Sequence, residues 1–391
     1  MKYYSTRDTS VRISAAEAVK MGLSRDGGLL TPAQLPKLSD EELNKLCGMT
    51  YQERAVYVMS LFLADFSKEE LADFAKAAYG PAKFDTPAVA PVRTVDETTH
   101  CLELWHGPTC AFKDMALQIM PRLLSRAIVK TGETRDALIL VATSGDTGKA
   151  ALEGYKDIDR IKIMVFYPVD GVSRVQKLQM ATQTGGNVNV CAIRGNFDDA
   201  QTGVKKIFGD ADMAEKLAAK GFVLSSANSI NWGRLAPQIV YYISAYCDLL
   251  ANGKIAMGDA INVVVPTGNF GNILAAVYAR QMGIPIKKFI CASNKNNVLT
   301  DFIRTGIYDR NRQFHTTESP SMDILISSNL ERLLYTVIGT KKTAEYMKSL
   351  VECGRYELST EDLAKISEHF VGYYTDEADT VLAIKDAYEN K

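Results

Sequence analysis

The sequence has 391 residues, of which 45 are lysine or arginine and 46 are aspartate or glutamate, giving a formal net charge of -1. This balance lacks the basic excess of a dedicated nucleic-acid binder, and an apolar content of 47% excludes a disordered chain. No run reaches the ~18 consecutive apolar residues that a membrane helix needs. We therefore expect two or three globular domains, with neither a nucleic-acid nor a membrane partner.

The cysteines and histidines give no support to metal or disulfide chemistry. The seven cysteines are an odd number without a CxxC pair, and the four histidines show no HExxH spacing. The first twelve residues contain no apolar core of a signal peptide. We expect no metal site, no disulfide framework and, by default, a cytoplasmic protein.

The first quarter of the chain carries strong helix-start signals. In a capping box, a hydroxyl accepts a hydrogen bond from a helix amide while a glutamate three residues later reaches back to the cap. Three such boxes occur in succession: Ser39 with Glu42, Thr50 with Glu53, and Ser67 with Glu70. They predict a group of short helices over residues 38–80.

From about residue 100, strand patterns alternate with helical ones. Apolar or alternating runs predict strands at 137–142, 160–167, 187–193, 261–265 and 287–292. Helical spacing predicts helices at 115–129, 149–155, 235–250 and 273–281. Strands separated by helices predict an α/β fold with right-handed crossovers and largely parallel sheets buried on both faces.

Two turns at the ends of predicted strands could bind anions. The segment TGNFGN at 267–272 opens a helix, and its glycines allow backbone amides to converge on a phosphate. The alternative is a tight turn with nothing bound. The segment TSGDTG at 143–148 departs from a P-loop at Thr143 and Ala150, and neither turn contains GxGxxG. It could hold a carboxylate or phosphate, or only cap its own helix.

A lysine and an arginine stand beside further helix starts. Lys113 lies in apolar company, where a partly desolvated amine has a lowered pKa and can form a Schiff base, although most lysines are surface charges. Arg234 closes the polar segment at 226–234 and could bind a substrate phosphate, or could pair with a surface group. One lysine with two anion cradles suits a cofactor that has an aldehyde and a phosphate.

Six segments in order resemble the threonine synthase family: YYSTRD, RDGGLLTP, LWHGPTCAFKDMA, ATSGDTGKAAL, NSINWGRLAPQIVYY and PTGNFGNILAA. The resemblance implies the tryptophan synthase β-like fold, with two open parallel-sheet α/β domains and a helical N-terminal region. We expect the helical region at 1–95, a first α/β domain at 96–225, and a second at 226–391.

The resemblance also implies roles for individual residues. Lys113 would form the Schiff base with pyridoxal 5'-phosphate (PLP), and Asp146 would face the ring hydroxyl of the cofactor. The turn containing Ser144 and Thr147 would hold the substrate carboxylate. The cofactor phosphate would be cradled by five consecutive residues: Gly268, Asn269, Phe270, Gly271 and Asn272. As a hypothesis of our own, the substrate phosphate would be bound by residues of the polar segment: Asn228, Ser229, Asn231 and Arg234.

The implied activity is that of a lyase, which converts the small molecule O-phospho-L-homoserine and water into L-threonine and phosphate. Freed Lys113 would be the base for the α- and β-protons. The alternatives are another PLP enzyme of this fold, such as a hydroxy-amino-acid dehydratase or a phospholyase, and a non-catalytic phosphate-binding protein. The sequence does not predict the oligomeric state or the residue that positions the attacking water.

The end of the sequence looks short for the family. Residues 373–391 are predicted to be helical and end without a C-cap signal. Relatives continue into a glycine-led strand and a DPHTAV-like segment that places a threonine near the pyridine nitrogen. Thr380 is not assigned to that role, because its neighbours match the preceding helix. We expect a truncated chain or a natural variant with an impaired cofactor pocket.

Overall fold

Short helices occupy the first quarter of the chain in the computed structural model, which describes residues 1–170 and 172–390. The three predicted capping boxes are confirmed, and they start α2 (Asp40–Cys47), α3 (Tyr51–Phe62) and α4 (Lys68–Ala78). Before them, β1 (Tyr3–Ser5) and β2 (Leu30–Pro32) pair antiparallel around α1 (Ala15–Met21).

The first sheet has four parallel strands in the order β7-β6-β5-β8. They are β5 (Asp136–Ala142), β6 (Ile161–Pro168), β7 (Val188–Ile193) and β8 (Phe222–Ser225). The connecting helices are α7 (Asp146–Tyr155), α8 (Arg174–Ala181), α9 (Phe197–Gly209) and α10 (Ala211–Ala219). The sequence pattern did not predict β8, a short strand whose main support is its pairing with β5.

The second sheet has three parallel strands in the order β13-β10-β9. They are β9 (Ile261–Pro266), β10 (Ile286–Ser293) and β13 (Phe370–Tyr374). Its α-helices are α11 (Trp232–Ala251), α12 (Gly271–Met282), α13 (Val298–Thr305), α14 (Leu330–Ile338), α15 (Thr340–Cys353), α16 (Thr360–Ser367) and α17 (Glu377–Asn390). One face of this sheet is partly open, contrary to the expectation of burial, because Val264 and Tyr373 are 64% and 57% exposed.

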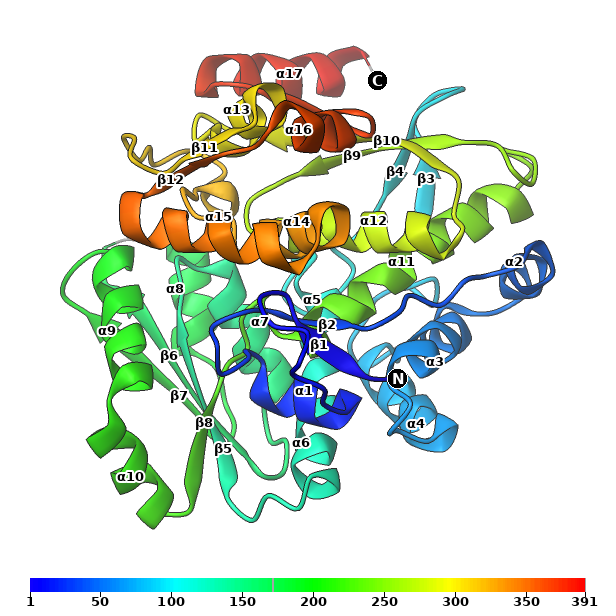
Figure 1. The fold of residues 1–391 in the computed structure, drawn as a ribbon. Coiled ribbons are helices and arrows are strands. Elements are labelled where there is room, and N and C mark those ends of the chain that lie inside the picture. Colours follow the sequence, from blue (N-terminus) through cyan, green and yellow to red (C-terminus); the bar gives the residue numbers. More distant parts are fainter. Residues whose placement is uncertain (171, 391) are drawn as a thin grey trace.

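Small elements complete the fold. Two further antiparallel pairs join β3 (Val92–Thr94) to β4 (His100–Leu102) and β11 (Ile307–Asp309) to β12 (Arg355–Glu357). The two parallel sheets lie in different parts of the molecule, and α11 and α12 run between them (Figure 1). The sheets occupy residues 136–225 and 261–374, while the exact domain boundaries drawn from the sequence stay a prediction.

Two predicted helices need correction. The run at 115–129 is divided into α5 (Asp114–Leu117) and α6 (Met120–Lys130). Pro121 is the cause, since it has no amide hydrogen to continue α5 but is well suited to the first turn of α6. The predicted helix at 373–391 begins only at Glu377, because Tyr373 and Tyr374 pair with β10 as the end of β13; Lys391 lies outside the described residues.

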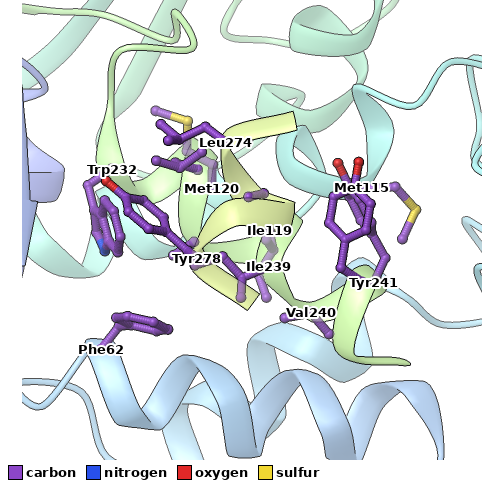
Figure 2. Packing of buried hydrophobic residues seen from close by; sticks show 14 of the residues in the cluster. Phe62, Met115, Ile119, Met120, Trp232, Ile239, Val240, Tyr241, Leu274 and Tyr278 are labelled. Atoms are coloured by element: carbon purple, nitrogen blue, oxygen red, sulfur yellow. The ribbon is translucent and has the colours of Figure 1, made fainter. Parts of the chain in front are cut away.

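The core joins the N-terminal helices to the second sheet through α11. Trp232, at the start of α11, packs against Tyr3, Phe62 and Tyr278, with ring centroids 5.5–5.7 Å apart (Figure 2). All four side chains are at most 1% exposed. Burying large aromatic side chains contributes much of the favourable free energy of folding. The start of α11, which carries Arg234, is therefore rigidly placed.

Over residues 1–170 and 172–390, no helix has both the length and the apolar character needed to cross a bilayer. The same residues contain no cluster of three or more His, Cys, Asp or Glu side chains suited to a metal ion.

Candidate active site

Lys113 is a buried amine directly before α5. Its side chain is 8% exposed, and its Nζ lies 4.6 Å from the centroid of the Phe112 ring. The ammonium forms an ion pair with Asp146 on α7. Burial lowers the pKa of Lys113, although Asp146 opposes this shift. The prediction that Lys113 is partly desolvated is thus confirmed, and a larger share of the amine is uncharged than for a surface lysine.

Asp146 begins α7 at the carboxyl end of β5. Burial raises the pKa of Asp146, but the charge of Lys113 and hydrogen bonds from Lys113, Ser321 and Thr147 outweigh that effect, so the pKa is lowered. Ser321 donates its hydroxyl to the same carboxylate oxygen as Lys113. Asp146 is therefore an anion at neutral pH. A carboxylate placed here holds the lysine amine at a fixed position.

In the turn before α7, one side chain caps the helix and two others remain partly exposed. Thr143 Oγ accepts from the amides of Gly145 and Gly148 at 2.9 Å, so part of the turn does cap its own helix. Gly145 has φ 144°, which favours glycine, and it packs against Gln176 of α8. The predicted ligands Ser144 and Thr147 are both partly exposed. Their role in binding the substrate carboxylate stays a prediction.

The glycine-rich turn lies at the start of α12. The carbonyl of Gly268 accepts from Ser327 Oγ at 2.7 Å, and the carbonyl of Asn269 accepts from Asn329 Nδ2 at 3.0 Å. In a trans peptide, the amide hydrogen points opposite to the carbonyl. The amides of Asn269 and Phe270 therefore point away from the segment that holds the carbonyls. No side chain caps α12, so its first amides can bind a phosphate.

The side chains of this turn divide into two groups. Phe270 adopts a left-handed conformation with φ 62°, which bends the chain into the helix. Asn272 turns its amide oxygen away, since it accepts hydroxyl bonds from Tyr241 at 2.5 Å and Tyr242 at 2.7 Å. The predicted cofactor contact of Asn272 would then come from its backbone amide or its side-chain nitrogen, both of which are donors. The residues present fit a phosphate held by main-chain groups.

Gly268 provides a test of this cradle. A Cβ atom at Gly268 would lie 3.3 Å from the carbonyl oxygen of Ser321 and 3.4 Å from Cα of Met322. We expect Gly268→Ala to weaken PLP binding about tenfold, because the crowded backbone must shift. Titration of visible absorbance against added PLP measures this. Gly203→Ala, in α9 with no atom within 4 Å of the new Cβ, should bind PLP normally; equal affinities for all three proteins would contradict the cradle.

The segment before α11 brings only some of its predicted ligands to the site. Arg234 is 5% exposed, and its one side-chain hydrogen bond goes to the carbonyl of Ala227 at 3.0 Å. The alternative of a surface partner is therefore wrong. Burial lowers the pKa of Arg234 to about 10, so the guanidinium is charged at neutral pH, and its field acts on both Asp146 and Lys113.

The other residues of this segment differ in whether their side chains are free to bind a substrate phosphate. Ser229 lies beside Gly271, with its Cβ 3.7 Å from where a Cβ of that glycine would stand. Asn228 is exposed. Asn231 is fully buried as the N-cap of α11, accepting from Gly233 and donating to the carbonyl of Val19 at 2.9 Å. Its amide has a structural role, so the hypothesis of a phosphate contact is not supported for Asn231.

A cavity of about 620 Å³ is lined by Asp146 and by Phe112, the residue before Lys113. Lys113 itself, Arg234 and residues 268–272 are not among the residues that line it. Its lining comes from four regions of the chain: the segment before Lys113, the start of α7, α8 and the short 3-10 helix Pro320–Met322. Lys149 lines it as well, and Ser321 reaches Asp146 from its wall. The sequence did not predict Ser321, and nothing in its local pattern marks it. The space is large enough for a cofactor and a small substrate.

His106 fixes the segment that leads to Lys113. One ring nitrogen bonds to Asp85 at 2.7 Å and the other to Glu103 at 2.8 Å. The bond to Glu103 raises the pKa of His106; partial burial opposes the rise and Asp85 adds to it. The His106 ring, with a carboxylate bonded to each nitrogen, thus holds the start of the segment that leads to Lys113.

This contact predicts a pH dependence. Because the folded pKa is raised, the stabilisation by His106 is complete below the ordinary value of about 6.5 and is lost as pH rises through the folded pKa. We expect His106→Gln to lower Tm by about 2 °C at pH 6, with the difference vanishing at high pH. Thermal unfolding at several pH values measures this. His100→Gln, whose ring contacts only the Thr94 hydroxyl, is the control and should show a flat difference. A flat difference for His106→Gln would contradict the contact.

A buried lysine and an uncapped glycine-rich turn at a helix start, in a fold with two parallel sheets, define the class of PLP-dependent enzymes with the tryptophan synthase β-like fold. Residues 90–358 match the family of pyridoxal-phosphate dependent enzymes, and residues 2–79 match the threonine synthase N terminus. Threonine synthase of Pseudomonas aeruginosa is 42% identical over 93% of this chain and 74% of its own length. The chain belongs to the threonine synthase family.

Solved structures support the same family assignment. PLP-bound threonine synthase from Brucella melitensis has a TM-score of 0.93 and 37% identity, covering 100% of this chain and 82% of its own. Human threonine synthase-like 1 is 44% identical over 97% of this chain, and the chain spans about half, 53%, of its length. The predicted fold class and PLP as cofactor are confirmed by these similarities.

Proposed function

We propose that this protein is a lyase that converts O-phospho-L-homoserine and water into L-threonine and phosphate, the last step of threonine biosynthesis. The observation that carries the proposal is a second buried cation, Arg234, whose charge acts on Lys113 and Asp146. The cradle at 268–272 accounts for the cofactor phosphate. A further buried guanidinium, whose charge reaches Lys113 and Asp146, suits a substrate that brings a phosphate of its own.

In the proposed reaction, Lys113, Asp146 and Arg234 each have a separate role. Bound PLP supplies an electron-withdrawing ring that stabilises negative charge at the substrate α-carbon. Lys113, with its lowered pKa, takes protons from the α- and β-carbons and returns one to the γ-carbon. Asp146 holds the amine in place between these transfers. Arg234 orients the phosphate and favours its departure.

The proposed reaction balances without an added oxidant or reductant. The bond between the γ-carbon and the phosphate oxygen breaks, and phosphate leaves with the electron pair. A proton is added at the γ-carbon, water adds its hydroxyl at the β-carbon, and the α-carbon regains a proton. The remaining proton goes to the released phosphate. Closure of the cavity by the segments that line it would keep water away from the earlier steps.

An assay with defined products tests the proposal. Purified protein loaded with PLP should release threonine and phosphate in equal amounts from O-phospho-L-homoserine, measured by amino-acid analysis and a phosphate assay. A phospholyase would release phosphate with ammonia and a keto acid, and a hydroxy-amino-acid dehydratase would release ammonia from threonine. Either of those product patterns would overturn the proposal. A non-catalytic protein would yield none of these products.

A further inference from the structure

A second cavity, of about 220 Å³, borders the segment that holds the cofactor loop. Residues 326–328, 330 and 331 form one wall. In this segment, Ser327 Oγ donates to Gly268 O at 2.7 Å, and Asn329 donates its backbone and side-chain amides to Asn269 O. The neighbours Ile326, Ser328 and Leu330 line the cavity. One short stretch of chain thus contacts both the cavity and the PLP phosphate cradle.

Most of the cavity wall is apolar. Leu29, Leu330, Met347 and Leu350 line it, together with the rings of Tyr308 and Tyr356. These two rings lie parallel, with centroids 5.3 Å apart. Ile326 and Val351, which also line the cavity, are 43% and 70% exposed. Exposed apolar side chains next to a hollow are typical of a ligand site rather than of a packed core.

The polar groups of the cavity are incompletely satisfied. The hydroxyl of Tyr356 is buried and has no hydrogen-bond partner, although the residue is only 4% exposed. Arg310 is half-buried, and its guanidinium contacts only the carbonyl of Val351, at 3.4 Å. Within the described part of the chain, no carboxylate pairs with Arg310. The cation without an anion favours a bound acceptor in the cavity, whereas the Tyr356 hydroxyl lies too deep for a ligand to reach.

The pairing of β11 with β12 places Tyr356 and Arg310 on the same side of these strands. Tyr308 pairs directly with Tyr356 across β11 and β12, so their side chains share a face. Arg310 follows Tyr308 by two residues and takes the same side of the chain. Glu331 is already held by Arg7 through two bonds, at 2.8 and 2.9 Å. Counting Arg7, Arg310 and Glu331, the cavity carries one unbalanced positive charge.

We propose that this cavity is an effector site for a small monocarboxylate with an apolar chain. The carboxylate accepts from Arg310, and the chain lies along Met347 and Leu350. Occupation changes how residues 327–329 hold the carbonyls of Gly268 and Asn269, and through them the amides of the cofactor loop. The effector affinity and the PLP affinity are then coupled in both directions.

Hexanoate is a suitable probe because it has one carboxylate and a short apolar chain. Binding to the PLP-loaded protein, measured by calorimetry without any substrate, should be saturable, whereas hexan-1-ol and hexylammonium should not bind. Arg310→Met should weaken hexanoate binding at least about tenfold. Met347→Trp, which fills the cavity with a larger apolar side chain, should abolish it. Arg194→Met, at an exposed arginine beside the first sheet, is the matched control and should bind normally.

Failure to bind hexanoate, equal binding of hexan-1-ol, or no loss in Arg310→Met would overturn the site. The coupling has its own readout, the rate at which PLP absorbance decays after dilution of the loaded protein. Saturating hexanoate should change that rate at least about fivefold, and Ser327→Ala, which removes the bond to Gly268, should suppress the change. An unchanged rate despite saturable binding would overturn the coupling. Neither measurement depends on the proposed threonine synthase reaction.

Discussion

Replacing Lys113 by alanine is expected to abolish the visible absorbance of the PLP-loaded protein and to lower turnover at least about ten-thousandfold. The reason is that the Lys113 amine is buried, has a lowered pKa, and is held by Asp146 beside the cavity. Alanine removes both the group that forms the Schiff base and the base that moves protons. An absorbance spectrum of the purified variant after addition of excess PLP, with the assay for threonine, measures both effects.

Lys149 provides the control for this substitution. It lines the same cavity, but its amine bonds to Gln183 and lies 3.8 Å from Glu153 instead of Asp146. Lys149→Ala should therefore keep the visible absorbance. If the absorbance survives unchanged in Lys113→Ala, another amine forms the Schiff base, and the assignment of Lys113 is wrong.

Local signals in the sequence were sufficient for the parts of the fold that local interactions stabilise. The capping box of Ser67 and Glu70 involves residues three apart, so its pattern can be read from four letters. The strand at 222–225 was missed for the opposite reason. It is four residues long, and its pairing partner β5 lies more than 80 residues earlier in the chain. Short strands supported by distant partners leave little trace in local periodicity.

In the candidate site, too, some features depend on local sequence and others on contacts between distant segments. Lys113 and the loop at 268–272 stand in recognisable turns, but each alone was also compatible with a surface lysine or an empty turn. The combination of one lysine with two anion cradles predicted the site. The ion pair between Lys113 and Asp146, and the hydroxyl that Ser321 adds to it, join three separate segments. Only the packing of α5 and α7 brings such groups together. The role of Asn231 was misjudged because an N-cap amide and a ligand amide look alike in sequence.

Replacing Arg234 by alanine is expected to weaken binding of O-phospho-L-homoserine about tenfold to a hundredfold, with little effect on PLP affinity. Arg234 is charged, and within the described residues its side-chain hydrogen bonding is limited to one contact, with the carbonyl of Ala227, so we propose that its remaining donors serve a substrate phosphate. In our proposal the PLP phosphate is held by main-chain groups at the start of α12, which no side chain caps and which the substitution does not touch. The two ligands should therefore respond differently.

The separation of the two affinities makes the prediction testable even though Arg234 is buried. Substrate binding is measured by the spectral change on adding O-phospho-L-homoserine, and PLP binding by titration of absorbance. Arg234→Lys, which keeps the charge but not the planar pair of donors, should recover part of the substrate affinity. A merely structural arginine would instead reduce both affinities together, since loss of its bond to Ala227 would disturb the start of α11 and the adjoining site as a whole. Equal losses for substrate and PLP would thus remove Arg234 from the substrate site and, with it, the observation on which the proposed reaction rests.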